Sequence, residues 1–398
     1  MNRNAEAHRR IAKPALLNRR GFVQMAGMTA LGLQAKGLHS TFGSANTGRP
    51  YSPHFVYVGV MGRTSGIHVF AAQGKQWRLL QVVASEAPVS LALHPSGGSL
   101  YVLNEVAEYR NLPRGSIEAY AVDTKTGMLT LLGREALALS ATMPRHVAVA
   151  PDGRQLMVAV HGGGAYNLMP ILADGRVGRV CGVVKEAGRG QVREHQETAH
   201  PQAVVFDSTG QRVIASDLGT DRLSVLSLEG GLELQERYTM PVASGPQHLA
   251  LHPSGHLLYV SHGLNGGLSA FGYDATEGKV TELRMRVPGQ YVDALAFHPV
   301  GDILYAASRG ATTAWRVDSL SGTLHPLQSR SMKLENGRGK VHGVTLLRDG
   351  RELAVLASNG VLRMTVDEQS GCLGEPELVA QIANARCFTI RQCEEIEV

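Results

Sequence analysis

Cysteine is scarce in this sequence, and the few cysteines present follow no metal-binding pattern. The 398 residues include four cysteines, Cys181, Cys372, Cys387 and Cys393. They show neither a CxxC pair nor zinc-ligand spacing, which argues against a metal centre built on cysteine. The chain also has no glycine-rich nucleotide loop and no Gly-x-Ser-x-Gly elbow. We interpret the cysteines as structural. In an exported protein two of the last three could form a disulfide, and the sequence does not choose the pair.

Charged residues are few as well, and the excess of positive charge lies at one end. Asp, Glu, Lys and Arg make up 18% of the residues, and the formal net charge is +5. Much of that excess comes from a basic cluster near the N-terminus: Arg3, Arg9, Arg10, Lys13, Arg19 and Arg20. Because the rest of the chain is close to neutral, nucleic acid is set aside as a partner. The 46 glycines and 43% hydrophobic residues instead indicate a globular protein rich in tight turns.

The first 45 residues resemble a twin-arginine (Tat) export signal. Arg19 and Arg20 precede Gly-Phe-Val and a mildly apolar stretch that is too short to span a bilayer stably. Small residues at Gly43-Ser44-Ala45 offer a cleavage point, so we predict a mature domain over residues 46–398. The resemblance implies export by the Tat machinery to the periplasm or exterior, without stable membrane insertion after cleavage. A disordered basic tail is the alternative interpretation.

A repeated glycine turn organises the rest of the chain. Strings such as LALHPSGGSLYVLNE and LALHPSGHLLYVSH place a turn glycine between two alternating strands. The turn glycines are Gly97, Gly153, Gly210, Gly255, Gly301 and Gly350. Their spacing of about 45 to 57 residues is the length of a four-stranded propeller blade. A second strand–turn–strand pattern follows these hairpins, for example LSAFGYDATEGKVTEL, and supplies the other two strands.

The two ends of the repeat complement each other. Residues 55–83 supply only three strands of a first unit, and the strand ARCFTIRQ (385–392) stands alone at the other end. Pairing the two would close a ring and remove exposed sheet edges. We therefore predict an all-β protein, a seven-bladed β-propeller of four-stranded blades closed by the C-terminal strand. A β-sandwich or a pair of domains would leave this complementarity unexplained.

Polar residues are expected to collect at one mouth of the central channel. The loops entering each inner strand lie on the same face of a propeller as the loops joining the second and third strands. Both sets are rich in histidine and charge: His146, His161, His200, His248, His262 and His342, with Glu105, Asp217, Arg145 and Arg309. Such a funnel suits an anionic, hydroxyl-bearing small molecule. By contrast His94, His252 and His298 stand beside the turn glycines at the opposite end, which indicates a structural role.

Several strings from about residue 53 onward resemble the bacterial lactonase family of seven-bladed propellers, 6-phosphogluconolactonase-like. Among them are MPRHVAVAPDG, HQETAHPQAVVFDSTG and SDLGTDRL. Carried over residue by residue, the resemblance implies site residues Glu105, Arg145, His146, Glu197, His200 and Asp217. Three positions depart from the family pattern. Gln247 replaces the usual arginine after Gly-Pro, Ser261-His262 replaces Asn-Glu, and Gln202 stands where a second histidine is common.

Our hypothesis from the sequence is hydrolysis of a sugar-derived lactone without a cofactor. His146 or Glu105 would act as general base, and Arg145 would hold the oxyanion with help from His248 or Arg309, while Asp217 orients a histidine. Residues expected to bind substrate are His161, Glu197, His200, Gln247, His248, His262, Arg309 and His342, and Lys340 could add to an anion site. Export and Gln247 favour an unphosphorylated aldonolactone. The alternatives are a non-catalytic propeller that binds a ligand or protein, and a metal site using His161, His262 and His342.

Overall fold

The computed structural model describes residues 54–63, 65–73, 75–289, 291–332, 340–347 and 350–392. All regular elements in these ranges are β-strands, and they form seven four-stranded sheets. No helix of the described part is long and apolar enough to cross a membrane. The predicted signal over residues 1–45 and Cys393 lie outside the described residues, so the signal and the domain boundary stay predictions.

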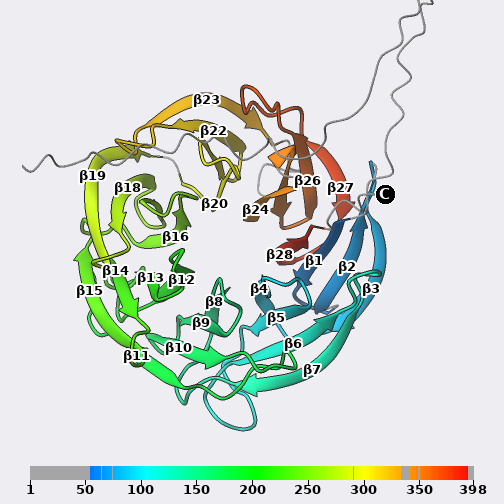
Figure 1. Ribbon diagram of the computed structural model, residues 1–398, viewed down its shortest axis with the longest axis vertical. Coiled ribbons are helices and arrows are strands. Elements are labelled where there is room, and N and C mark those ends of the chain that lie inside the picture. The colour runs from blue at the N-terminus through cyan, green and yellow to red at the C-terminus, as the bar shows by residue number, and fades with distance from the viewer. Residues whose placement is uncertain are drawn as a thin grey trace, which may run out of the picture. The chain divides into compact units, whose positions relative to one another are not determined.

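The seven sheets are the blades of a propeller arranged around a central axis (Figure 1). Blade 1 contains β28 (Ala385–Arg391), β1 (His54–Val60), β2 (Gly66–Ala72) and β3 (Arg78–Ala84). Blade 2 contains β4 (Pro88–Leu93), β5 (Ser99–Asn104), β6 (Ser116–Val122) and β7 (Leu129–Ala136). Blade 3 contains β8 (Pro144–Val149), β9 (Gln155–Val160), β10 (Ala165–Pro170) and β11 (Gly182–Lys185). Blade 4 contains β12 (Pro201–Phe206), β13 (Arg212–Asp217), β14 (Arg222–Ser227) and β15 (Glu233–Thr239).

The remaining blades follow the same order from the axis outward. Blade 5 contains β16 (Pro246–Leu251), β17 (Leu257–His262), β18 (Gly267–Asp274) and β19 (Lys279–Pro288). Blade 6 contains β20 (Ala294–Phe297), β21 (Ile303–Ala307), β22 (Ala311–Val317) and β23 (Leu324–Ser331). Blade 7 contains β24 (Val341–Leu347), β25 (Glu352–Ala357), β26 (Gly360–Thr365) and β27 (Glu377–Gln381). The predicted all-β, seven-bladed architecture is confirmed.

The last strand of the chain closes the ring, as the sequence predicted. β28 is the inner strand of blade 1 and pairs antiparallel with β1, with Phe388 opposite Val58 and Arg391 opposite Phe55. The Arg391 guanidinium also donates to the Gly97 carbonyl in blade 2. Three strands from the N-terminal end and one from the C-terminal end therefore share a sheet, so blade 1 forms only when both ends of the repeat are present.

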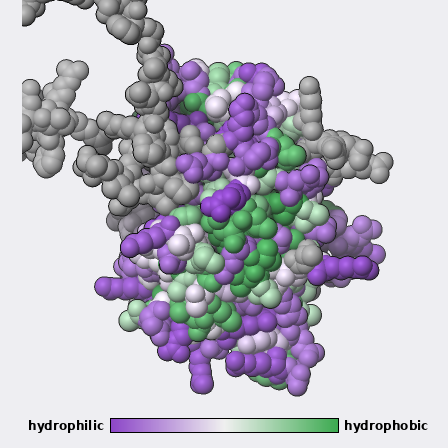
Figure 2. Space-filling model, turned by 90° about the vertical axis from the view of Figure 1, so that its right-hand side faces the viewer, coloured by the Kyte–Doolittle hydropathy of each residue, from purple (hydrophilic) through white to green (hydrophobic). Residues whose placement is uncertain are grey.

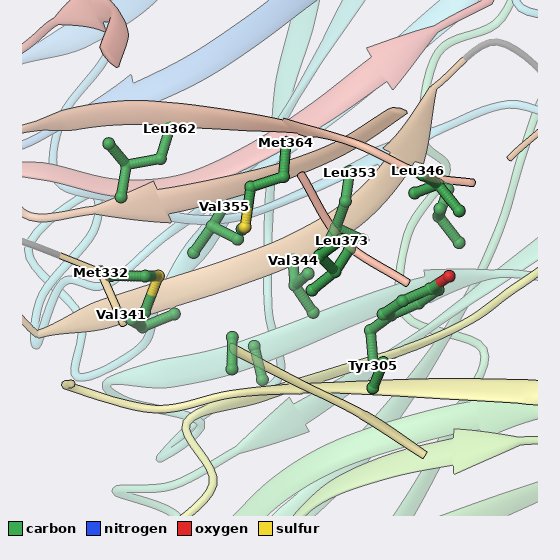
Figure 3. Packing of buried hydrophobic residues seen from close by; sticks show 14 of the residues in the cluster. Tyr305, Met332, Val341, Val344, Leu346, Leu353, Val355, Leu362, Met364 and Leu373 are labelled. Carbon is green, nitrogen blue, oxygen red and sulfur yellow. The ribbon is translucent and has the colours of Figure 1, made fainter. Parts of the chain in front are cut away.

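Each interface between neighbouring blades has its own apolar core. The buried hydrophobic residues fall into seven clusters, one for each pair of adjacent blades. Figure 3 shows the cluster between blades 6 and 7, where Tyr305 of β21 lies with Val355 of β25 and Met364 of β26. Because no single core dominates, the stability of the ring depends on every interface, and burial of apolar surface is the main favourable contribution.

A second contact between blades repeats at the turns. The His94 ring in blade 2 lies 3.0 Å from the Gly153 carbonyl in blade 3 and donates to it through Nε2. His252 makes the same bond to Gly301 at 2.5 Å. Because these glycines adopt positive φ, +72° at Gly153 and +89° at Gly301, only glycine fits them without strain. The structural role predicted for His94 and His252 is therefore confirmed.

Apolar side chains are exposed on the outer strand of blade 1, away from the axis. Figure 2 views the ring from the side where Figure 1 places β3 and β27, and it shows apolar surface there. Leu79 and Val82 of β3 are exposed.

The described cysteines Cys181, Cys372 and Cys387 form no disulfide with one another. Of the pairings left open, the one between Cys372 and Cys387 is thus absent, and those with Cys393 stay predictions.

Candidate active site

β-bulges at the starts of the inner strands build the candidate site. The register of β8 with β9 shifts between Pro144 and His146, so Arg145 is the extra residue. The same shift makes Gln202 the extra residue of β12, and His342 that of β24. In β16 the irregularity spans Gln247 and His248. A bulge leaves its extra residue outside the ladder and re-aims its side chain, so blades 3, 4, 5 and 7 each place a polar side chain at the channel.

Two connected cavities lie along this axis. The mouth cavity has a volume of about 760 Å³, and the channel cavity has a volume of about 470 Å³. Five residues line both: Arg145, Gln202, Gln247, Asp293 and Lys340. Of the predicted site residues, the mouth cavity also contains His161, His200, His262 and Arg309. The channel cavity also contains Glu105, His146, His248 and His342. The geometry therefore gathers residues from most blades into a space that fits a small molecule.

Glu105 and Arg145 form an ion pair at the junction of the two cavities. Glu105 directly follows β5 in blade 2, and its Oε1 lies 2.5 Å from Nη1 of Arg145 in blade 3. The Glu105 side chain is only 10% exposed, whereas that of Arg145 is 37% exposed. The Nε atom of Arg145 is buried and has no hydrogen-bond partner among the described residues. Glu105 therefore holds the guanidinium in place, and the arginine keeps donors to offer an anionic oxygen.

His161 and His200 stack on each other in the mouth cavity. Their ring centroids are 4.2 Å apart and the ring planes differ by 16°. His161 directly follows β9, and His200 directly precedes β12, so the stack joins blades 3 and 4. The Nδ1 atom of His200 lies 3.2 Å from the His161 carbonyl oxygen. Nε2 of Gln202 lies 2.9 Å from Nδ1 of His161 and 3.1 Å from the His200 carbonyl oxygen.

The other histidines near the axis are held as neutral rings. Burial lowers the pKa of His146, His248 and His342 to about 4 in each case. The backbone N–H of Val204 donates to Nδ1 of His146 at 3.4 Å, so the neutral His146 ring carries its proton on Nε2. Both nitrogens of His262 are engaged, Nδ1 with Asn265 and Nε2 with Ser269. These rings can shape and polarise the channel, but His262 has no nitrogen left for a ligand.

Asp217 and Glu197 line neither cavity. Asp217 is fully buried, and its Oδ1 accepts hydrogen bonds from the backbone N–H groups of His200 at 2.7 Å and Gly219 at 2.9 Å. Burial raises the pKa of Asp217 to about 6. Its contact is thus with the His200 backbone and not with an imidazole ring. The Glu197 side chain is exposed. We keep Asp217 as a positioning residue and leave Glu197 out of the proposed site.

The metal alternative finds no geometric support. His161 and His262 line the mouth cavity and His342 lines the channel cavity. Among residues 54–392, apart from the undescribed positions, no group of three His, Cys, Asp or Glu side chains is placed to hold a metal ion. The donor sets that zinc prefers need such a group within one coordination sphere.

Comparison with known proteins identifies the family. The model of the family described as "Lactonase, 7-bladed beta-propeller" matches residues 55–389. The chain belongs to this lactonase family. The 6-phosphogluconolactonase of Bacillus subtilis is 27% identical over 221 residues, which cover 53% of this chain and 62% of that protein. The 6-phosphogluconolactonase of Formosa agariphila is 27% identical over 62% of this chain and 72% of the relative. The match to the Bacillus protein thus spans less than two thirds of its length.

A solved structure supports the fold of this lactonase-family chain. The Pseudomonas aeruginosa periplasmic gluconolactonase PpgL superposes with a TM-score of 0.74 at 23% identity. The superposition covers 85% of this chain and 99% of that one. At this level of identity the likeness concerns the arrangement of the blades. The individual side chains of the site are therefore argued from the geometry of this chain.

Gln202 and Asp293 line both cavities but were outside the set that sequence reasoning predicted, and Lys340, expected only to add to an anion site, lines both as well. Gln202 was singled out only as a departure from the family pattern. A signal for it was present, because Gln202 follows the first proline of its inner strand just as Arg145 and Gln247 do. Asp293 and Lys340 directly precede β20 and β24 without that proline. Burial raises the pKa of Asp293, and one of its oxygens is buried without a partner among the described residues.

Proposed function

We propose that this protein hydrolyses a sugar-derived lactone to the open-chain acid at the mouth cavity, without a cofactor. The observation that carries the proposal is the Glu105–Arg145 ion pair, which presents a fixed guanidinium to a cavity of about 760 Å³ in a member of the lactonase family. The names of the Bacillus and Formosa relatives support the same chemistry.

Lactone opening needs an activated water and a site for the developing negative charge. Water adds to the lactone carbonyl carbon, and the carbonyl oxygen becomes an oxyanion. We assign Arg145 to this oxyanion, because charge-assisted hydrogen bonds that strengthen as charge develops lower the barrier. Glu105 is a positioning residue for Arg145. His146 acts as a neutral donor, since its Nδ1 already accepts a backbone hydrogen bond.

We further propose that the substrate is an unphosphorylated aldonolactone met after export. The glutamine Gln247 stands where the family usually has an arginine, which removes one cation from the shared wall of the cavities. Asp293 adds a carboxylate to the same wall beside Lys340. A phosphate group bound there would be repelled by that carboxylate. The predicted Tat-type signal and the likeness to a protein named periplasmic gluconolactonase support a location outside the cytoplasm.

The test is a pH-stat assay of the chain from Asn46 onward with glucono-δ-lactone and its 6-phosphate. We expect hydrolysis above the spontaneous rate, faster for the neutral lactone. Arg145→Gln should lower kcat/KM by roughly 100-fold, the usual effect of losing one oxyanion donor. The matched control is Arg176→Gln, which removes an exposed arginine that pairs with Asp174 and lines neither cavity.

Two outcomes would contradict the proposal. If no lactone of either kind is hydrolysed above the spontaneous rate, the catalytic function is wrong. Saturable binding of a sugar lactone or acid in that same preparation would then favour the alternative of a non-catalytic ligand-binding propeller. If both arginine variants lose activity to the same extent, Arg145 has no special role.

A further inference from the structure

The stacked histidines His161 and His200 carry an inference that goes beyond the binding roles considered so far. Both rings line the mouth cavity, together with Arg145. Hydrogen bonds at the Nδ1 atoms decide where the ring protons lie, because a neutral imidazole carries one proton. If Nδ1 donates, Nε2 can only accept, and if Nδ1 accepts, Nε2 carries the proton and donates. The partners of these two rings are unambiguous.

The proton of neutral His200 is on Nδ1. Its partner at 3.2 Å is the carbonyl oxygen of His161, and a carbonyl oxygen can only accept. The Nε2 atom of His200 therefore bears a lone pair. The backbone around this ring is fixed, since its N–H donates to Asp217 and its carbonyl oxygen accepts from the N–H of Leu218 at 3.2 Å. His200 is held as a hydrogen-bond acceptor in the wall of the mouth cavity.

The proton of neutral His161 is on the opposite nitrogen, Nε2. The side-chain amide of Gln202 decides this, because its nitrogen lies 3.1 Å from the His200 carbonyl oxygen and must donate there. The same nitrogen lies 2.9 Å from Nδ1 of His161, which must accept. His161 is also kept neutral: burial, the neighbouring His200 and Arg145 lower its pKa to about 4. One ring of the stack is therefore an acceptor and the other a donor.

We propose that His200 is the general base and His161 an oxyanion donor for the lactone hydrolysis, an assignment that rests on the proposed function. The water oxygen bonds to the lactone carbonyl carbon while its proton passes to Nε2 of His200. The electron pair of the carbonyl π bond moves onto oxygen, where Nε2–H of His161 and the Arg145 guanidinium donate to it. As the C=O bond re-forms, the bond to the ring oxygen breaks, and His200 returns the proton to that oxygen.

Gln202 is the positioning residue of this pair. In this chain it takes the place where the family commonly has a second histidine, and its amide cannot titrate. Its two donated hydrogen bonds lock the tautomer of His161 and the backbone of His200 together. The departure from the family pattern thus supplies a device that fixes one donor and one acceptor.

Protonation of His200 should stop the reaction, because an imidazolium has no lone pair to accept a proton. Charged and titratable groups face the pair from several elements: Arg145 on β8, Glu194 and His195 in the loop between β11 and β12, Asp217 at the end of β13, and His262 at the end of β17. Each of these except Asp217 lines the mouth cavity, and Asp217 holds the His200 backbone. The pH dependence of kcat therefore reports on the base assigned here.

The experiment measures kcat and KM of the exported chain across pH for His200→Asn. Asparagine keeps a donor near the position of Nδ1 but has no counterpart of Nε2. We expect kcat to fall by at least about 100-fold with little change in KM, and the pH dependence of kcat to change. His200→Ala should regain activity when imidazole is added, which a purely structural histidine would not allow. The control is His256→Gln, an exposed histidine outside both cavities.

A second variant tests the tautomer lock. Gln202→Glu has only acceptors at neutral pH, so it would force the proton of His161 onto Nδ1 and remove its donor. We expect a lower kcat with the pH dependence of the wild type retained. If the wild type hydrolyses lactones while His200→Asn keeps its rate and its pH profile, the inference is wrong although the proposed function stands. If the wild type hydrolyses none, the proposed function itself has failed.

Discussion

Replacing Gly153 by alanine should destabilise the ring through a clash between two blades. Gly153 has a φ of +72°, and a Cβ built on it would overlap the ring of His94, which donates to the Gly153 carbonyl oxygen. Alanine at positive φ costs about 1 to 2 kcal/mol. Overpacking against the imidazole adds about 1 to 3 kcal/mol, and loss of the hydrogen bond adds about 1 kcal/mol. The free energy of unfolding should fall by about 3 to 6 kcal/mol in all.

The matched control is Gly230→Ala. Gly230 has nearly the same φ, +76°, but nothing lies within 4 Å of the Cβ position. Its variant should therefore lose only the backbone contribution of about 1 to 2 kcal/mol. The assay is urea denaturation followed by fluorescence and circular dichroism. Adding His94→Ala to Gly153→Ala should recover much of the difference in unfolding free energy between the two glycine variants, because the overlapping ring is gone. If the two glycine variants unfold at the same urea concentration, the contact between blades has no energetic weight.

Three further predictions concern the stability of the propeller. Acid should destabilise the folded protein, because the pKa of His146 and of His248 is about 4 in the folded state against 6.5 for the free side chain. The stability present above pH 6.5 is therefore lost as the pH falls toward 4, by at most about 3 kcal/mol for each ring. Urea midpoints measured against pH check this, and replacing both rings by glutamine should flatten the slope. Tyr259→Phe removes a buried hydroxyl that donates to the Gly322 carbonyl oxygen at 2.8 Å. The free energy of unfolding, measured by thermal denaturation, should fall by about 1 kcal/mol. An unchanged melting temperature would show that the hydrogen bond contributes nothing. A chain that ends at Asn384 lacks β28, so it should lose cooperative thermal unfolding and elute from a sizing column as an expanded species. The control is a chain that ends after residue 392. A compact, cooperatively unfolding chain without β28 would refute the closure argument.

The architecture was readable from the sequence because its causes are local. A positive-φ glycine between two alternating strands specifies a hairpin wherever it occurs, and regular spacing of such turns leaves few ways to bury all the apolar faces. The position of the site followed from the same geometry. In antiparallel strands the start of one lies beside the end of the next, so Arg145 at the start of β8 and His161 just after β9 had to reach the same face.

The pairings inside the site were not readable, because they depend on the distance and register between blades. Nothing in the sequence indicates that Glu105 of blade 2 holds Arg145 of blade 3, or that His161 stacks on His200. The sequence suggested His146 or Glu105 as general base, and we propose a donor role for His146 instead, since a backbone N–H from the next blade occupies its Nδ1. Asp217 was expected to orient a histidine, and its Oδ1 accepts a hydrogen bond from the backbone N–H of His200 and not from an imidazole ring.

The sequence by itself determined that seven blades form, that the C-terminal strand closes them and that polar residues meet at one mouth. Those properties rest on hydrophobic alternation and turn chemistry, which act over a few residues. The tertiary structure alone decided which of the gathered side chains are charged, which are neutral and which nitrogen of each imidazole carries the proton. Burial and hydrogen-bond partners fix those states, and both arise only when neighbouring blades pack.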